Sequence, residues 1–248
     1  MSTNDTKIMI EGAMTLETEF LVASLQQPRE HMLGSWHFVE GQYHDVPLVI
    51  AVTSVGMSNA AAATALGIEH FHPTAVISQG TAGGHDPALK AYDIVLGQQS
   101  FDASAYRTAK EKTADWSHME LMGTYAYNPA DGTFIPQAVH YPGGPHLLNT
   151  AHMVSRIYTR GQVIDGTIAS CNTWNRQLER ILFLHDNFNS SCEDMETASA
   201  ALVCRQYNVP FLGIRILSNT EFNDEDFQPE TAHVCQQFVL DVVQHLPH

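Results

Sequence analysis

Short apolar runs alternate with helix-like segments along most of this chain, and that alternation limits the fold more than any other feature. The runs predicted to be strands are residues 8–10, 36–43, 47–53, 75–78, 93–96, 162–170 and 210–217. The segments with apolar residues near helical spacing are 15–25, 57–71, 146–160, 174–185, 197–207 and 227–246. Strands that alternate with helices predict an α/β fold, in which helices cover both faces of a mostly parallel sheet.

The length of the chain and its cysteines predict one self-sufficient domain. The chain has 248 residues, and α/β domains often reach about 200–250 residues as a single unit. No internal repeat and no linker rich in Gly, Pro or Ser divides it, so we expect one domain over residues 1–248. The cysteines fit no CxxC or zinc pattern and His70 and His72 do not share a helix face, which predicts buried free thiols and no metal site. This cysteine usage is typical of a cytoplasmic protein.

The charge balance excludes several classes of partner. The chain has 12 Lys and Arg against 27 Asp and Glu, a net charge of −15, and no basic run interrupts this excess. Nucleic acids and anionic membranes need clustered Lys and Arg, so neither is expected as a partner. A polyphosphate substrate is disfavoured for the same reason. No apolar stretch approaches the roughly 18 residues of a membrane span, and the polar N-terminus has no signal-peptide core.

Unusual residues follow several of the predicted strands. Binding sites in parallel sheets lie beyond the carboxyl ends of the strands, where this chain has residues 12–17, 80–84, 193–196 and 215–219. Each segment alone has a simpler interpretation: a solvated helix residue, a tight turn, an acidic first turn of a helix, and a cap. Residues 80–84 have neither the GxGxxG spacing of a dinucleotide loop nor the Lys of a P-loop.

Together these segments resemble the nucleoside phosphorylase/nucleosidase superfamily, and within it the methylthioadenosine/S-adenosylhomocysteine nucleosidases. The matching pieces are IEGAM at 10–14 with Glu17, GTAGG at 80–84, DIV at 93–95, EDME at 193–196 and VPF…RILS within 209–218. The resemblance runs from Lys7 to the C-terminal helix, and it is poor only over residues 101–145. It implies a three-layer α/β/α fold around a mixed, partly barrel-like sheet, and a homodimer whose partner completes the 5′ end of the site.

The same resemblance implies hydrolysis of the N-glycosidic bond of 5′-methylthioadenosine, in methionine salvage and without any metal or organic cofactor. It leaves open whether S-adenosylhomocysteine, with its larger 5′ group, is also a substrate. This reaction needs a carboxylate to activate water, an anchor for the ribose hydroxyls and a donor at N7 of the purine. Glu17 matches the family glutamate that activates water. Glu196 matches the glutamate that binds the ribose hydroxyls, and Met195 flanks the ribose. Asn219 stands where the family has an aspartate that serves N7.

The remaining substrate-binding positions are likewise taken from the resemblance. They are Met14, Val55, Thr81, Trp174, Asn175, Ser218 and Phe227. Met14 and Val55 would line the apolar pocket for the 5′-thio group, and Thr81 would lie near ribose and water. Trp174 would stack on the purine, while the backbone of Asn175 would bind the edge of the base.

Asn219 is the departure from the family that bears most on activity. An amide donates a hydrogen bond but cannot transfer a proton at neutral pH, and general-acid catalysis contributes roughly 10²–10⁴-fold. An amide also suits a 6-oxopurine, where it serves O6 and N7 together, although it can equally accept from the amino group of adenine. A 6-oxopurine nucleosidase or phosphorylase therefore stays open, as does a nucleoside-binding protein without activity. Residues 80–84 offer no Arg for a phosphate, which favours water as the nucleophile.

Residues 101–135 show no clear periodicity but carry several aromatic residues, among them Phe101, Tyr106, Trp116 and Tyr125. Long irregular segments in compact domains are usually functional or lie at an interface, and aromatic residues are enriched at interfaces. We expect part of this segment to form the interface of the homodimer.

Overall fold

The computed structural model describes residues 6–112 and 116–246, and its centre is a ten-stranded mixed sheet. The strands are β1 (Ile8–Gly12), β2 (Gln26–Leu33), β3 (Trp36–Tyr43), β4 (Val46–Val52), β5 (Ala75–Gly84), β6 (Ile94–Asp102), β11 (His140–Pro142), β12 (Val163–Ser170), β13 (Ser190–Asp194) and β14 (Phe211–Thr220). They run in the order β11-β6-β12-β13-β5-β1-β4-β3-β2, and β14 pairs with both β5 and β6. Because of this double pairing, β5, β13, β12, β6 and β14 close into a small barrel.

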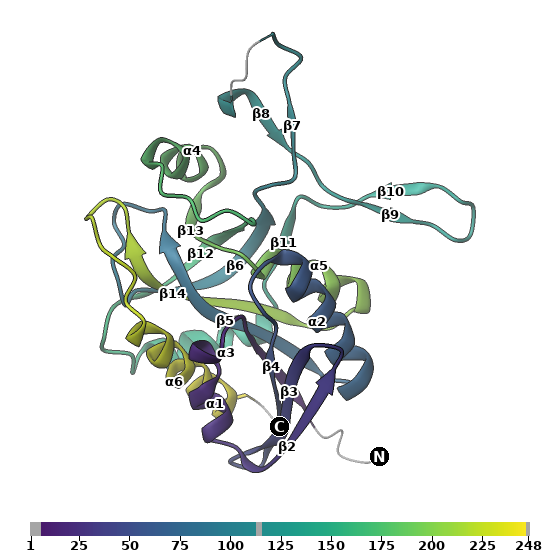
Figure 1. Cartoon of the computed structure of the whole chain (residues 1–248), viewed down its shortest axis with the longest axis vertical. Coiled ribbons are helices and arrows are strands. Elements are labelled where there is room, and N and C mark those ends of the chain that lie inside the picture. The colour runs from purple at the N-terminus through teal and green to yellow at the C-terminus, as the bar shows by residue number, and fades with distance from the viewer. Residues whose placement is uncertain (1–5, 113–115, 247–248) are drawn as a thin grey trace.

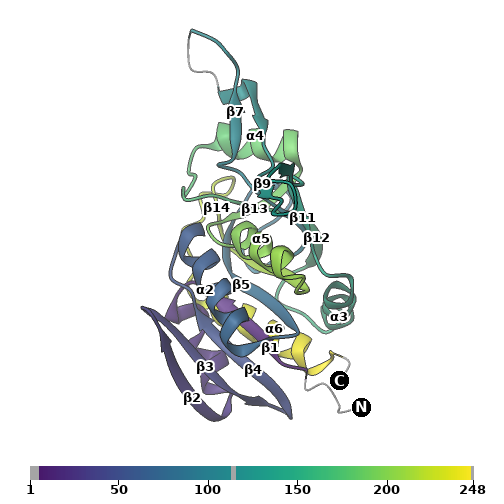
Figure 2. The same cartoon turned by 90° about the vertical axis from the view of Figure 1, so that its right-hand side faces the viewer.

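Helices cover both faces of the sheet and produce the expected three layers. They are α1 (Glu19–Ala23), α2 (Met57–Phe71), α3 (Pro145–Ser155), α4 (Leu178–Phe188), α5 (Thr197–Tyr207) and α6 (Glu230–Gln244). In Figure 1, α2 and α5 lie on one side of the sheet, and α1 and α6 lie on the other. Figure 2 views the layer of α2 and α5 from its own side.

Strand β1 shows how the sequence pattern produces these layers. Successive side chains of a strand point to opposite faces. Ile8 and Ile10 accordingly pack into the apolar cluster that includes α3 and α6. Met9, between them, packs with residues of α2 and α5 on the opposite face. The strand is buried on both faces, and its first three residues form an apolar run in the sequence.

The structure corrects several boundaries drawn from the sequence. Residues 80–84, interpreted as a turn, continue strand β5, because β14 pairs with them along their whole length. Strand β2 was not predicted, since it is an exposed, polar edge strand held by β3. Residues 15–25 form a short 3₁₀ helix, η1 (Thr15–Glu17), followed by α1. Helices α4 and α6 begin at Leu178 and Glu230, later than expected, because the residues before them form loops.

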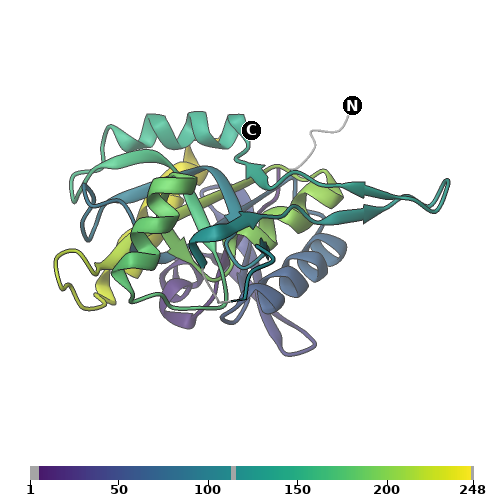
Figure 3. The ribbon, with the colours of Figure 1, turned by 90° about the horizontal axis from the view of Figure 1, so that it is seen from above.

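The segment between β6 and β11 forms two extended hairpins that project from the barrel, as Figures 1 and 3 show. Their strands are β7 (Tyr106–Thr108) with β8 (Met119–Leu121), and β9 (Tyr125–Tyr127) with β10 (Phe134–Pro136). A 3₁₀ turn, η2 (Trp116–His118), precedes β8. Residues 113–115 and the side chain of Trp116 lie outside the described part of the chain.

Phe101 is a correction to the expected interface. It lies in β6, is fully buried, and packs against Phe188 with 5.9 Å between the ring centroids. It therefore belongs to the core, whereas Tyr106 and Tyr125 are exposed on the hairpins.

Candidate active site

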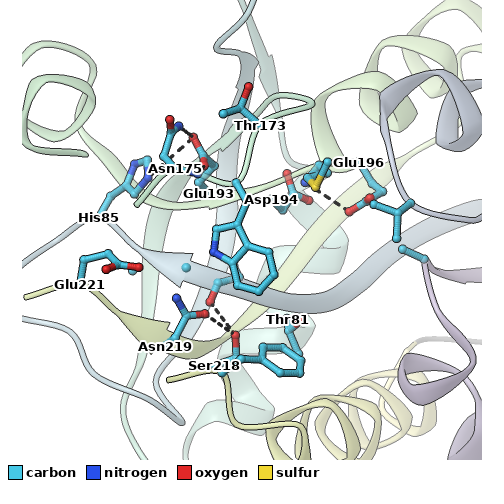
Figure 4. Close-up of a pocket in the computed structure, with 18 of the residues that line it drawn as sticks. Thr81, His85, Thr173, Asn175, Glu193, Asp194, Glu196, Ser218, Asn219 and Glu221 are labelled. Carbon is cyan, nitrogen blue, oxygen red and sulfur yellow. Dashed lines mark hydrogen bonds and ion pairs between the residues drawn. The ribbon is translucent and has the colours of Figure 1, made fainter. Parts of the chain in front are cut away.

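A pocket of about 270 Å³ lies at the carboxyl ends of β1, β5, β13 and β14. Figure 4 shows the side chains that converge on it. Its wall includes every site residue expected from the sequence: Met14, Glu17, Val55, Thr81, Trp174, Asn175, Met195, Glu196, Ser218, Asn219 and Phe227. The residues expected from the sequence thus meet in one pocket, and their individual roles stay predictions.

Glu17 is a buried carboxylate that four donors surround. Its Oε2 accepts hydrogen bonds from the backbone N–H groups of Ala13 (3.0 Å) and Met14 (3.3 Å). Its Oε1 accepts from the backbone N–H of Thr81 (2.8 Å) and from the Thr81 hydroxyl (3.0 Å). These four hydrogen bonds fix the position of both carboxyl oxygens of Glu17 in the wall of the pocket.

The close approach of Glu17 to β5 depends on a glycine. A Cβ atom at Gly80 would lie 2.6 Å from Oε1 of Glu17, well inside van der Waals contact. The side-chain amide of Gln79 next to it donates to the backbone carbonyl of Glu17 (2.6 Å). Gly80 therefore lets the backbone of β5 lie against the carboxylate of Glu17. A residue with a side chain at this position would prevent the contact.

Glu196 is the second carboxyl group of the pocket, and it has fewer donors. Its Oε1 accepts from the backbone N–H of Gly56 (2.9 Å), and its Oε2 accepts from the N–H of Met195 (3.3 Å). Burial raises the pKa of Glu196 to about 8, the charge of Asp194 adds to this rise, and the charge of Arg215 opposes it. Glu196 therefore takes up a proton more readily than an exposed glutamate does.

A buried ion pair holds the segment that carries Glu196 in place. Asp194 and Arg215 are both almost fully buried, with 2.8 Å from Nε and 2.6 Å from Nη2 of Arg215 to Oδ2 of Asp194. The same carboxylate accepts from the backbone N–H of Thr197 (2.9 Å), the first residue of α5. Asp194 thus fixes the junction between β13 and α5, where Glu196 lies. An arginine inside an otherwise apolar strand was the one signal in the sequence for this pair.

Asn219 lies at the opposite side of the pocket, and one neighbour orients its amide. The hydroxyl of Ser218 donates to Oδ1 of Asn219 (2.9 Å). The amide nitrogen lies on the side of Gly83, where a Cβ would be 3.7 Å from it. Asn219 therefore presents its NH₂ group, a donor, to the pocket.

Two aromatic residues form an apolar wall of the pocket. The rings of Trp174 and Phe227 meet edge to face, with centroids 6.4 Å apart and planes at 69°. Trp174 is 63% exposed, which is unusual for so large an apolar side chain. A flat ligand in the pocket would cover this surface.

A polar cluster beside this wall had no role predicted from the sequence. Both the backbone and the side-chain amide of Asn175 donate to the carboxylate of Glu193, with 3.2 Å for the backbone N–H. His85 lies next to Glu193 (3.8 Å) and contacts the Ser190 hydroxyl through Nδ1 (2.9 Å). Burial lowers the pKa of His85 to about 3, so this ring is neutral. Glu193 lies in strand β13, which corrects its interpretation as the start of a helix.

No group of three His, Cys, Asp or Glu side chains within residues 6–112 and 116–246 is arranged to hold a metal ion. The four cysteines are buried with free thiols, as predicted. None of the helices in the described part of the chain is long and apolar enough to cross a membrane.

Two comparisons with known protein sequences indicate the same family. The sequence profile of the phosphorylase superfamily matches residues 7–244. The 5′-methylthioadenosine/S-adenosylhomocysteine nucleosidase of Shewanella pealeana is 31% identical over 251 residues, which cover 97% of this chain and 100% of that protein.

Solved structures agree with this assignment. The Neisseria meningitidis 5′-methylthioadenosine/S-adenosylhomocysteine nucleosidase, in complex with methylthio-immucillin-A, superposes with a TM-score of 0.79 at 25% identity, covering 96% of this chain and 99% of that one. The futalosine hydrolase of Helicobacter pylori superposes with a TM-score of 0.79 at 25% identity, covering 99% and 100%. The profile, the sequence relative and the shared fold place the chain in the phosphorylase superfamily, within the family of 5′-methylthioadenosine/S-adenosylhomocysteine nucleosidases.

Proposed function

We propose that the protein hydrolyses the N-glycosidic bond of 5′-methylthioadenosine, with S-adenosylhomocysteine as a second substrate, and releases adenine and the 5-thioribose. The observation that carries the proposal is the pair of buried glutamates, Glu17 and Glu196, at the wall of one pocket that also has an exposed aromatic face. Cleavage builds positive charge on the ribose, and negative charge beside the sugar stabilises that transition state.

Glu17 is proposed to activate the water. Three of its four donors are backbone N–H groups that the fold holds in place, but the fourth is the Thr81 hydroxyl. Rotation of this hydroxyl frees a lone pair on Oε1, to which a water can donate. Thr81 would then bind the same water or a ribose hydroxyl, which fits its place on the pocket wall.

Glu196 is proposed to accept hydrogen bonds from the ribose hydroxyls. Its two backbone donors leave lone pairs free on both oxygens, and a carboxylate accepts two O–H bonds strongly. Met195 would pack on the ribose, and Met14 and Val55 would line the apolar end that receives the 5′-thio group. Val55 is 46% exposed, so a ligand or a partner subunit can still cover this end.

Asn219 is proposed to donate to N7 of the purine. Ser218 holds the amide oxygen, so the NH₂ group is the part that faces the ligand. Asn219 polarises the leaving base but cannot protonate it, and the proton has to come from water. We therefore expect slower turnover than in an enzyme that has an acid at this position. The difference is at most roughly 10²–10⁴-fold.

Asn219 also supports a second candidate, the same cleavage of a 6-oxopurine nucleoside. One assay separates these options: release of free base from methylthioadenosine, S-adenosylhomocysteine, inosine and adenosine, with and without phosphate. Adenine release from methylthioadenosine that does not depend on phosphate is the expected result. Strict dependence on phosphate would make the protein a phosphorylase, and binding without release would make it a nucleoside-binding protein.

We also propose that the protein is a cytoplasmic homodimer, acts in methionine salvage and needs no cofactor. The hairpins between β6 and β11 support the dimer, because they project from the barrel and expose Tyr125, Tyr127, Phe134 and Ile135. Phe134 is 67% exposed, and contiguous exposed apolar groups of this kind mark interaction surfaces. Light scattering at micromolar concentration should give twice the 27.4 kDa mass of one chain; a mass of one chain would contradict the dimer.

A further inference from the structure

Glu193, Gly83 and Asn219 lie in one row across three neighbouring strands of the barrel. Glu193 of β13 pairs with Gly83 of β5, and Asn219 of β14 pairs with the same glycine. Residues paired in this way project to the same face, and neighbouring strands lie about 4.8 Å apart, so the backbones of Glu193 and Asn219 are separated by roughly 10 Å. Because Gly83 has no side chain, the floor between the two polar groups is open.

The three residues all line the pocket, and Figure 4 shows Glu193 with Asn175 on one side and Asn219 on the other. The separation suits a purine ring that makes one hydrogen bond at each side. The row therefore offers one polar group at each of two edges of the pocket.

Glu193 presents an acceptor to that space. Its carboxylate accepts from the backbone N–H of Asn175 (3.2 Å), from the side-chain amide of the same residue, and from the Cys171 thiol (3.4 Å). His85 beside it is neutral. Burial raises the pKa of Glu193 above its ordinary value, although the hydrogen bonds from Asn175 and Cys171 oppose this rise.

The backbone N–H of Asn175 was expected to bind the edge of the base. In the structure this N–H donates to Glu193 instead. N1 of adenine is an acceptor that needs a donor, and here it would meet a carboxylate. A 6-oxopurine instead carries a hydrogen on N1, which a carboxylate accepts. Its O6 and N7 are acceptors, which match the NH₂ group that Asn219 presents.

We propose that the pocket also takes 6-oxopurine nucleosides with a 5′-thio substituent, and that Glu193 is the specificity-determining residue that reads N1–H. The inference rests on the proposed hydrolysis at this pocket. Water gives one proton to Glu17 as its oxygen bonds to C1′ of the ribose, and the electron pair of the C1′–N9 bond leaves with the base. The base takes up one proton and Glu17 returns one to solvent, so the products are hypoxanthine and the 5-thioribose.

The test compares 5′-methylthioinosine with 5′-methylthioadenosine on the parent protein and on Glu193→Gln. The amide of this variant can donate to N1 of adenine, and it no longer offers a carboxylate to N1–H. The ratio of kcat/KM for the inosine substrate to that for the adenosine substrate should fall at least ~10-fold, since a mismatched polar group in a buried site discriminates strongly. Glu179→Gln, the same charge change at an exposed position of α4 outside the pocket wall, should leave the ratio unchanged.

A second measurement needs no variant and covers the case in which Glu193→Gln does not fold. The parent protein should bind hypoxanthine at least ~10-fold more tightly than 1-methylhypoxanthine in calorimetry, because the methyl group replaces the N1 hydrogen. Equal affinities, or cleavage of methylthioadenosine with no cleavage of methylthioinosine, would overturn the role of Glu193. If the parent cleaves neither nucleoside, the hydrolase proposal fails, and the calorimetric comparison still decides how the base is read.

Discussion

Glu11 and Glu17 are two buried glutamates of the same N-terminal segment with opposite surroundings. Glu17 faces the pocket and has four hydrogen-bond donors. Glu11 lies in β1 beneath α2, and within the described residues neither of its carboxyl oxygens has a hydrogen-bond partner. The Thr64 hydroxyl beside it donates to the carbonyl of Ala60 instead (2.7 Å).

Burial without donors favours the neutral form of a carboxyl group, whereas hydrogen-bond donors favour its charged form. Burial raises the pKa of Glu11 to about 8, and neither Thr64 nor the charge of Arg215 offsets this rise. Glu196 has two donors, and its pKa is also raised to about 8. The number of hydrogen-bond donors therefore distinguishes Glu17 from both Glu11 and Glu196.

The largest effect is expected for Glu17→Gln, which removes the carboxylate that accepts four hydrogen bonds. Turnover of methylthioadenosine should fall at least ~10²-fold, because an amide cannot accept the proton of water. The amide NH₂ would also face one of the N–H groups that now donate to Glu17, so the melting temperature should be measured beside the rate. Turnover within about threefold of the parent would remove Glu17 from the mechanism.

Glu196→Ala should have the next largest effect, because it removes the proposed anchor of the ribose. KM should rise and kcat should fall, by roughly 10–10²-fold together in kcat/KM, since hydrogen bonds to a charged group are lost. A 2′-deoxy substrate should lose less than the ribo substrate. Equal losses for both would contradict a contact with the 2′-hydroxyl and leave only the 3′-hydroxyl.

Asn219→Asp would sharpen the comparison by adding a carboxyl group at the pocket. In the present structure the side chain at position 219 has one hydrogen-bond donor, the Ser218 hydroxyl. The new carboxyl group should therefore resemble that of Glu11 and hold a proton near neutral pH. Methylthioadenosine cleavage should be at least as fast as in the parent and should fall more steeply at high pH. Activity on methylthioinosine should drop ~10-fold or more, because an acceptor would face O6. If this variant instead loses methylthioadenosine cleavage and the parent prefers the 6-oxopurine, the adenine preference is wrong.

Glu11→Met should have the smallest effect on catalysis, because Glu11 is outside the pocket wall, but it should change stability. A carboxyl group whose folded pKa is raised from 4.5 to about 8 favours the folded state below pH 4.5, and this contribution is lost as pH rises through 8. The variant should therefore gain about 1–3 kcal/mol in free energy of unfolding at pH 8 to 9, the usual cost of an unpaired buried polar group. Urea unfolding at pH 5 and pH 9 checks this; a gap between parent and variant that does not widen with pH would contradict it.

Much of the site could be predicted because strand ends are visible in sequence. The apolar runs that became β1, β5 and β14 place Glu17, Thr81 and Asn219 at their carboxyl ends, where sheets of this kind bind ligands. Glu193 was missed because β13 is a polar strand, with the sequence SSCED, and its neighbours make it look like the start of a helix. Its position opposite Gly83 depends on pairing between distant segments, which local patterns do not record.

The same limit applies to the fold. Strand β2 is polar and exposed, so its strand state comes from β3 and not from its own pattern. Residues 80–84 have the composition of a turn, yet they are extended because β13 and β14 bind both edges of β5. In each case a tertiary contact overrides local preference.

The double pairing of β14 also has a consequence for synthesis of the protein. β14 closes the barrel and carries Ser218 and Asn219, but it comes near the end of the chain, roughly half of the chain length after its partner β5. A ribosome delivers the N-terminal glutamates long before this strand, and contacts between distant segments form late and slowly. During synthesis Glu17, the residue proposed to activate water, is therefore present well before Ser218 and Asn219, and the pocket wall is complete only after β14 has been made.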